Sequence, residues 1–396
     1  MVRERGAIIG MLIRAIPLIL WSFSAGAAAA GAEGPDFSYG DAHFSIEYFK
    51  AAYNASKNCA VSPLSVRLAM AAFLQAADSS SFEETLQRAF YLPQQKTLAS
   101  ENAASFLNEV SEMRQLQIAY KVLKNSDPLT DEFAAVLEKV FKTSPEEIQF
   151  SEKSLLLNSA NGWGNKVTNG LIRNFLYDSS LDPRSEMAIL NSVSLRASWA
   201  EKFSPAMTDR QIFTFRDGTR NVQMMHKTIE VLYKADSTYQ TVQIPYSEES
   251  DLSMWLLMPA SGAGSFKSLM AALTDDLLEE IETTAVPTVV DISLPRFEIQ
   301  TVHTVRKVIE KLGYGQLYRA NELSLFKAHK STLGEMVQGA LLKVDEEGTD
   351  STVAQPITAQ DRTENTRFNA NQPFIFIVKK ISTDTIVLIG HYSNYY

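Results

Sequence analysis

Hydrophobic and polar positions change their spacing about halfway along the chain. In the first half, apolar residues recur at the intervals of three and four that place them on one side of a helix. This pattern predicts helices at residues 44–53, 63–77, 81–90, 103–112, 131–140 and 155–168. Ser62 followed by Pro63 is typical of a helix start, because proline is tolerated in the first turn.

The second half carries short apolar runs and alternating segments that indicate β-strands. Strands are predicted at residues 187–195, 211–215, 221–225, 230–233, 239–245, 252–258, 289–294, 340–345, 373–378 and 385–390, with one late helix at 305–312. A helix-rich half followed by a strand-rich half is typical of an α+β fold. We see no internal repeat and no interdomain linker, so we expect one domain over residues 37–396. Its helix-rich N-terminal half would pack on large mixed β-sheets.

A long polar stretch interrupts this pattern near the C-terminal end. Residues 348–372 lie between the predicted strands 340–345 and 373–378 and show neither helical nor strong strand periodicity. Loops longer than about 12–15 residues in a compact domain are usually functional or disordered. Exposed polar loop tips are also preferred sites of proteolysis. Because this stretch contains Arg362, we interpret it as an exposed loop that a protease attacks.

Composition indicates a folded globular protein and narrows its partners. Of the 396 residues, 45% are hydrophobic and 21% are charged, values that argue against intrinsic disorder. The net charge of −9 disfavours nucleic-acid binding, which needs a basic surface. Residues 89–112 carry Lys96 as their single basic residue, so this stretch contains no clear heparin site. We therefore expect no nucleic-acid partner, and whether a glycosaminoglycan acts as cofactor stays open.

The first thirty residues have the pattern of a secretory signal peptide. Arg3, Arg5 and Arg14 form a basic start before a short apolar core at 15–21, and small residues at 24–32 offer several cleavage sites. The apolar run is far shorter than the roughly 20 residues needed to span a membrane. We therefore expect a leader over residues 1–30 and a secreted, extracellular protein with no membrane partner. Asn54-Ala55-Ser56 is a glycosylation sequon, which we expect near a surface.

Conventional catalytic motifs are missing. No Gly-x-Ser-x-Gly elbow and no His-Glu-x-x-His helix occur, and the five histidines lack metal-ligand spacing. The single cysteine, Cys59, lies in an apolar run and is interpreted as a buried small hydrophobe. These observations favour a protein without catalytic residues, metal or cofactor. A secreted hydrolase with a scattered catalytic triad is the distant alternative.

Several short motifs follow one another from about residue 44 to residue 394. They are Asn58-Cys-Ala-Val-Ser-Pro-Leu-Ser65, residues 158–172, Asn191 to Trp199 with Phe203, Met224-Met225, Pro295-Arg-Phe297, Val344-Asp-Glu-Glu-Gly-Thr349, Asn371-Gln-Pro-Phe374 and Ile389-Gly390. Each motif alone is weak. Their order and spacing together resemble those of the serpins, the serine protease inhibitor superfamily, over nearly the whole chain after the leader.

This resemblance implies a single-domain serpin fold and a suicide mechanism of inhibition. A protease attacks the reactive-centre loop, forms an acyl-enzyme through its own nucleophile, and is trapped when the cut loop inserts as a new strand in the large sheet. The native state is then kinetically held, and the inhibitor is expected to act as a monomer. By resemblance, the hinge of this loop comprises Glu346, Glu347, Gly348, Thr349, Asp350, Ser351, Thr352, Val353 and Ala354.

The resemblance also assigns residues at the point where the sheet opens. Ser62, Ser65, Asn191 and Gln338 would form a buried polar cluster, and Trp199 would lie at the breach where insertion begins. Many serpins have a histidine where Gln338 stands here. A glutamine can still hydrogen-bond, but it removes any pH dependence at that position.

The reactive bond follows from the family's spacing. Counting sixteen residues from Glu346 gives Arg362–Thr363, and counting back from Pro373 gives the same bond. Arginine before the cut suits a trypsin-like serine protease, whose primary pocket carries a carboxylate. Arg367 is a second candidate with a less favourable spacing.

The composition of the loop argues both for and against insertion. Alternate residues from Thr349 to Ala359 are mostly small or apolar, as one buried face of a strand requires, and Gly348 supplies backbone freedom. However, Ser351-Thr352-Val353 replaces the family's run of alanines, and Pro356 cannot donate a ladder hydrogen bond. A non-inhibitory serpin, cleaved as a substrate or acting as a binding or carrier protein, therefore stays open as the alternative.

Overall fold

The computed structural model describes residues 40–177, 181, 184–260, 265–348 and 366–395. The helices in this part of the chain are α1 Asp41–Ala52, α2 Pro63–Gln75, α3 Ser80–Phe90, α4 Lys96–Glu112, α5 Asp131–Phe141, α6 Lys153–Val167, α7 Phe266–Ala272, α8 Asp275–Thr284 and α9 Val305–Lys311. Short 3-10 turns lie at Pro205–Met207, Glu248–Ser250 and Gly315–Tyr318.

The strands are β1 Cys59–Val61, β2 Leu116–Lys124, β3 Glu146–Glu147, β4 Met187–Leu195, β5 Asp209–Phe215, β6 Gly218–Ala235, β7 Tyr239–Pro245, β8 Leu252–Pro259, β9 Val286–Pro295, β10 Phe297–Thr304, β11 Glu335–Val344, β12 Thr366–Asn369, β13 Phe374–Lys380 and β14 Thr385–Tyr392. They form a nine-stranded sheet in the order β1-β14-β13-β8-β7-β6-β9-β12, with β5 paired to β6. A five-stranded sheet has the order β10-β11-β4-β2-β3. At its centre β11 and β4 run parallel, whereas β10 and β2 flank them in antiparallel pairs.

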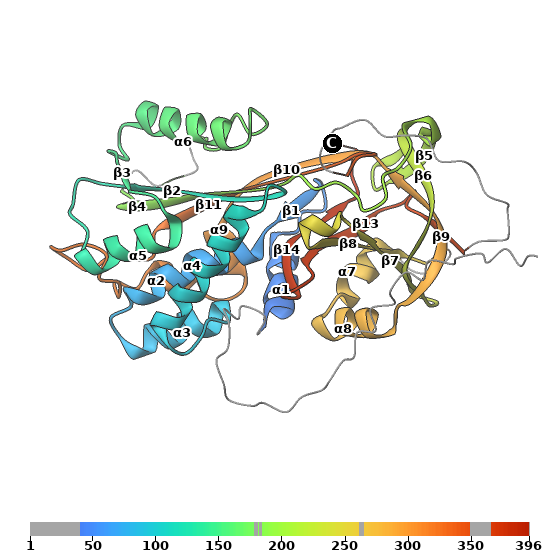
Figure 1. The fold of residues 1–396 in the computed structure, drawn as a ribbon. Coiled ribbons are helices and arrows are strands. Elements are labelled where there is room, and N and C mark those ends of the chain that lie inside the picture. Colours follow the sequence, from blue (N-terminus) through green and yellow to red (C-terminus); the bar gives the residue numbers. More distant parts are fainter. Residues whose placement is uncertain (1–39, 178–180, 182–183, 261–264, 349–365, 396) are drawn as a thin grey trace, which may run out of the picture. The chain divides into compact units, whose positions relative to one another are not determined.

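Helices cover both faces of the five-stranded sheet (Figure 1). Helix α6 lies across one face, and Leu156 belongs to the same buried hydrophobic cluster as Leu190 of β4 and Val337 of β11. Helices α2, α4 and α5 lie on the opposite face (Figure 1). Every residue of α2 from Pro63 to Leu74 is buried, as expected of a helix that is apolar nearly all round. The start of α2 is thereby fixed directly under the sheet.

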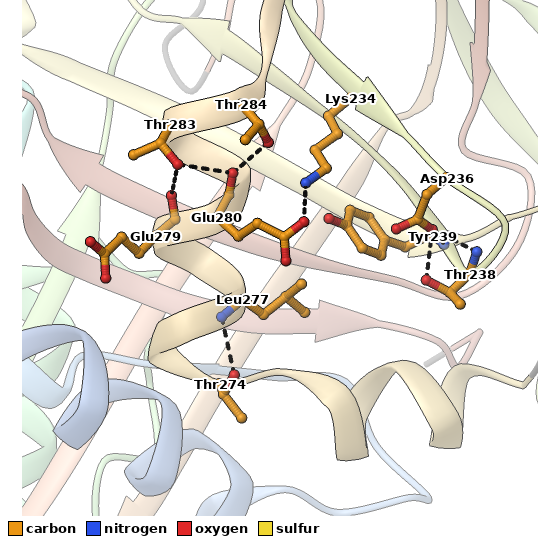
Figure 2. A network of polar contacts seen from close by, with 10 residues as sticks. All are labelled: Lys234, Asp236, Thr238, Tyr239, Thr274, Leu277, Glu279, Glu280, Thr283 and Thr284. Carbon is orange, nitrogen blue, oxygen red and sulfur yellow. Dashed lines mark hydrogen bonds and ion pairs between the residues drawn. The ribbon is translucent and has the colours of Figure 1, made fainter.

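An ion pair joins helix α8 to the C-terminal end of strand β6 (Figure 2). Lys234 Nζ donates to Glu280 Oε1 at 2.5 Å and lies 5.8 Å from the centre of the Tyr239 ring. In the turn between β6 and β7, Asp236 Oδ1 accepts from the backbone N–H groups of Thr238 and Tyr239. None of the helices in the described part of the chain is both long enough and apolar enough to cross a membrane.

The structure confirms the α+β fold and most predicted elements. Strands β4 and β7 coincide with their predicted ranges, and Ser62 caps α2 through a hydrogen bond from Ser65 N to its Oγ. The predicted strands 221–225 and 230–233 are wrong as separate elements, because β6 continues unbroken from Gly218 to Ala235. The predicted helix 103–112 begins earlier, at Lys96.

Cys59 is buried, with 4% of its surface exposed, as predicted for a small hydrophobe. Burial raises the pKa of its thiol to about 12. The reactive species of cysteine is the thiolate, so this side chain is unreactive at neutral pH.

Candidate functional site

The predicted hinge begins with a tight turn after β11. Asp345 N donates to the Gly348 carbonyl at 2.8 Å, and Gly348 N donates back to the Asp345 carbonyl at 3.1 Å. Gly348 has a φ of +126°, and a Cβ atom there would lie 2.2 Å from the Ala197 carbonyl oxygen. Both the backbone conformation and the close approach require glycine at this position.

Trp199, predicted at the breach, contacts this turn directly. Its backbone N donates to the Glu347 carbonyl at 2.9 Å, and its indole Nε1 donates to the Asp345 carbonyl at 3.0 Å. The indole stacks on the Tyr246 ring, with 4.5 Å between centroids and 6° between planes. Trp199 is 1% exposed, so its two hydrogen bonds lie in a buried environment. The tryptophan therefore holds the last turn before the loop against the nine-stranded sheet.

The two hinge glutamates each have a basic partner. Glu346 accepts from Arg296 Nε at 2.7 Å, is also bound by Arg296 Nη2, and accepts from Thr208 Oγ1 at 2.5 Å. Glu347 pairs with Lys202 at 2.5 Å. Burial alone raises the pKa of Glu346, but the hydrogen bonds from Arg296 and Thr208 outweigh it, so its pKa lies below the ordinary value. Glu346 is therefore ionised at neutral pH and clamps the turn to Arg296.

The structure brings the four predicted polar residues together beneath β4 and β11. Gln338 Nε2 donates to the Ser62 carbonyl at 2.8 Å and to Ser65 Oγ at 2.9 Å, while Gln338 Oε1 accepts from Ser62 N at 2.9 Å. Ser65 Oγ lies 2.6 Å from Asn191 Oδ1. Gln338 and Asn191 are opposite each other in the parallel register, and all four residues are fully buried. The cluster thus links the start of α2 to both central strands.

Sequence reasoning missed further residues that complete these contacts. Tyr120 of β2 donates its hydroxyl to the Ser65 carbonyl at 2.7 Å. Thr208, Lys202 and Tyr246 reach the hinge from segments about 100 to 140 residues earlier in the chain. No local pattern in the sequence pointed to these partners. Only the burial of Glu346 and Glu347 in the structure requires them, because unpaired buried carboxylates are costly.

The loop itself connects the two sheets. It leaves the end of β11 in the five-stranded sheet, and the chain re-enters the nine-stranded sheet as β12, which pairs in parallel with β9. Arg367 lies within β12, opposite Asp291. A protease binds its substrate by pairing with an extended backbone. The backbone groups around Arg367 are already paired with β9, so this residue is a poor cleavage site. The following predicted residues lie outside the described part of the chain: Thr349, Asp350, Ser351, Thr352, Val353, Ala354, Arg362 and Thr363.

Asn54 lies in an exposed turn just after α1. Its side-chain Oδ1 accepts from Ser56 N at 2.9 Å, the geometry of an Asx turn. The side chain is therefore accessible, as a glycosylation acceptor must be. The predicted leader, residues 1–30, falls outside the described residues.

Known proteins match this chain along nearly its whole folded length. The family model described as Serpin (serine protease inhibitor) matches residues 40–395. Neuroserpin from Rattus norvegicus is 25% identical over 381 residues, which are 91% of this chain and 92% of that protein. Antitrypsin from Bombyx mori is 26% identical over 346 residues, covering 82% and 86%. The solved structure of SRPN18 from Anopheles gambiae aligns with a TM-score of 0.80 at 26% identity, covering 90% of this chain and 97% of that one.

Proposed function

This chain belongs to the serpin family, and from that premise we propose that it is a secreted suicide inhibitor of a trypsin-like serine protease. The protease would cleave the loop between Arg362 and Thr363 and remain attached as an acyl-enzyme. The freed strand would then enter the five-stranded sheet and carry the protease with it. Protease inhibition is the activity in the family's description. We infer that the target protease prefers arginine because the family's spacing places Arg362 directly before the cleaved bond.

The parallel pairing of β4 and β11 is the observation that carries this proposal. The pairing runs from Ala188 opposite Glu335 to Leu195 opposite Leu342. A strand that folds back from the 345–348 turn would run antiparallel to both neighbours. Insertion would therefore replace one parallel ladder by two antiparallel ladders, which are slightly more stable per residue. That exchange supplies a driving force for trapping.

A covalent complex on a denaturing gel tests the proposal. The purified protein is mixed with trypsin, quenched, boiled in detergent and separated by size. We expect a band of combined mass for the wild type and none for Arg362→Ala. Arg367→Ala, which changes an exposed arginine inside β12, is the matched control and should still form the complex. Loss of the complex with Arg367→Ala alone would contradict the assigned bond.

Pro356 favours a second candidate, a non-inhibitory serpin that binds or carries another molecule. Proline cannot donate to a ladder, so the inserting segment would leave one bond unmade. On the same gel this function would give a cut near Arg362 without any complex. Pro356→Ala would then be expected to restore trapping if proline alone prevents insertion.

The hydrolase alternative has one geometric observation in its favour. Ser293 Oγ lies 2.9 Å from His226 Nδ1, and His226 Nε2 lies 3.0 Å from Asp209 Oδ1. The Asp209 side chain is 61% exposed, and the three residues lie on the adjacent strands β9, β6 and β5. Water around the exposed Asp209 carboxylate weakens its electrostatic interaction with His226, which a catalytic triad needs in a water-excluded site. We therefore expect no ester turnover by the protein alone, and turnover abolished by Ser293→Ala would revive this alternative.

Secretion and glycosylation are further parts of the proposal. Expression of the full chain in a secreting eukaryotic cell should release a protein that lacks residues 1–30 or nearly so. Mass spectrometry of the released N-terminus measures this directly. Treatment with an amidase that removes N-linked glycans should shift wild type but not Asn54→Gln. Retention of the whole leader in a cell-bound protein would contradict the secretory assignment.

A further inference from the structure

The start of β9 forms a free edge of the nine-stranded sheet. On one side, β6 pairs with β9 over its whole length from Val286 to Pro295. On the other side, β12 pairs only with the stretch from Val290 to Ser293. No described strand covers that side of Val286 to Val289, and these two valines are 58% and 49% exposed. Because β12 runs parallel to β9, any extension of β12 toward its N-terminus lies along this edge.

The backbone groups that face this edge belong to every second residue of β9. Ala370 N donates to the Ser293 carbonyl at 2.9 Å, so Ser293 directs its backbone groups toward β12. Pro287 lies six residues earlier and therefore faces the same side. Ser293 is opposite Asn369, and its bond with Ala370 follows the rule of a parallel ladder: a residue accepts from the residue after its partner and donates to the residue before it. Pro287 has no N–H, so it can accept but cannot donate.

The register of β12 on β9 shows which hydrogen bond Pro287 cannot make. Thr366 is opposite Val290, so counting back along both strands sets Thr363 opposite Pro287. A donor at position 287 would therefore reach the carbonyl oxygen of the preceding residue, Arg362. In the proposed reactive bond, that oxygen must enter the oxyanion hole of the protease when the carbonyl carbon is attacked. Proline thus removes the one N–H of this edge that would compete for it.

The rest of the edge favours strand pairing, because Val286, Thr288 and Val289 are β-branched. Such an edge readily accepts another strand. We propose that Pro287 is a positioning residue that stops the ladder at the reactive bond and keeps the Arg362 carbonyl oxygen free for the protease. This inference rests on the proposed position of the cleaved bond.

Trypsin cleavage of the full chain tests this role. The initial rate of attack is the rate at which intact chain is lost, whether to a complex or to a cut product, and mass spectrometry identifies cutting between Arg362 and Thr363. Pro287→Val supplies the missing N–H and is expected to slow this attack about threefold to tenfold, the effect of one net hydrogen bond. Thr288→Val, the matched control, introduces the same side chain without a new N–H and should be attacked at the wild-type rate. Equal rates for all three proteins would overturn the proposal.

Amide hydrogen exchange detects the same contact without a protease. In Pro287→Val, the new amide at position 287 should exchange at least about tenfold more slowly than an unpaired amide, because the Arg362 carbonyl accepts from it. Exchange at the unpaired rate would contradict the proposal. A lower thermal midpoint with an unchanged cleavage rate would show a merely structural proline and would contradict it too. If trypsin does not cut the wild-type chain after Arg362, the proposed function fails by itself, and exchange at position 287 alone decides whether Pro287 stops the ladder.

Discussion

Two buried regions of this protein differ in how their strands are held together. In the nine-stranded sheet, β8, β13 and β14 are antiparallel neighbours, and each of their residues is buried. In the five-stranded sheet, β4 and β11 are parallel neighbours with Asn191 and Gln338 facing each other. We call the first region the apolar centre and the second the polar seam. In the proposed mechanism, the apolar centre stays fixed while the polar seam opens.

The apolar centre and the polar seam differ in the interactions that are lost when their strands separate. Opening the apolar centre would expose surface worth about 25 cal/mol per Å². Opening the polar seam breaks the backbone ladder between β4 and β11, which an entering strand can remake, and the side-chain contact between Gln338 and Asn191. Side-chain truncations in the apolar centre should therefore reduce the free energy of unfolding without changing the trapping of the protease in a covalent complex. Changes at the polar seam should alter the trap with a smaller effect on stability.

The largest effect is expected from Phe376→Ala in the apolar centre. Phe376 is fully buried on β13 and packs against Gly390 of β14. Removing a buried phenylalanine ring costs about 3–5 kcal/mol. Urea unfolding of the purified variant measures this loss. At a low temperature at which Phe376→Ala is still folded, it should form the covalent complex with trypsin. If Phe376→Ala were as stable as wild type but formed no complex, the distinction between the apolar centre and the polar seam would be contradicted.

Acid should produce an effect of similar size over two pH units, from two histidines outside the polar seam. Burial lowers the pKa of His303 to about 4 and that of His391 to about 3. Their unfolded pKa is about 6.5. The unfolded chain therefore binds protons that the folded chain does not, and the stability from both neutral rings is full above pH 6.5. It is lost as the pH falls toward 4, by about 1.4 kcal/mol per pH unit and per histidine.

Thermal midpoints measured between pH 7.5 and 4.5 check this pH dependence. His303→Phe should reduce the slope, because one of the two groups is removed. Gln338→His should steepen it, because it places a titrating ring within the polar seam. A wild-type midpoint that stays constant over this range would contradict the assignment.

Gln338→Leu should have an intermediate effect. It leaves Ser62 N without its acceptor and Ser65 Oγ without its donor, at a cost of about 1–3 kcal/mol. Gln300→Leu on the adjacent strand β10 is the matched control, since Gln300 is exposed. We expect Gln338→Leu, and not Gln300→Leu, to change the number of inhibitor molecules consumed per protease trapped. Identical stoichiometries would show that the polar seam does not control insertion.

The smallest effect is expected from Lys234→Met. Its ion pair with Glu280 is partly exposed, and neither residue belongs to the apolar centre or to the polar seam (Figure 2). Exposed ion pairs contribute about 0–1 kcal/mol, and high salt screens them further. Chemical denaturation should detect little change, and inhibition should be unaltered. A loss of trapping here would mean that the division into two regions is incomplete.

Local patterns in the sequence predicted much of the fold but little of the hinge's surroundings. The continuous apolar run of β4 and the Ser62-Pro63 start of α2 are local signals, and both were predicted within a residue. Strands β2, β3, β10 and β12 and helices α7 and α8 were missed, although β10 alternates from Phe297 to Gln300. Partners such as Lys202 and Tyr246 are brought to the hinge only by long-range strand pairing. No local periodicity records that pairing.

The polar cluster shows a different limit. Ser62, Ser65, Asn191 and Gln338 were predicted by family resemblance, and the structure places them in one hydrogen-bonded group. Nothing in the spacing of these four residues indicates that they meet. Tyr120 belongs to the same group but was not predicted, since an isolated tyrosine in an alternating strand has no distinguishing pattern.

The thermal midpoint of the protein before and after a single cut at Arg362 tests the central claim most directly. If the loop enters between β4 and β11, the cut protein should unfold at a temperature higher by tens of degrees, since the second ladder forms only after cleavage. A cut chain that melts at the same temperature as the intact chain would contradict the account.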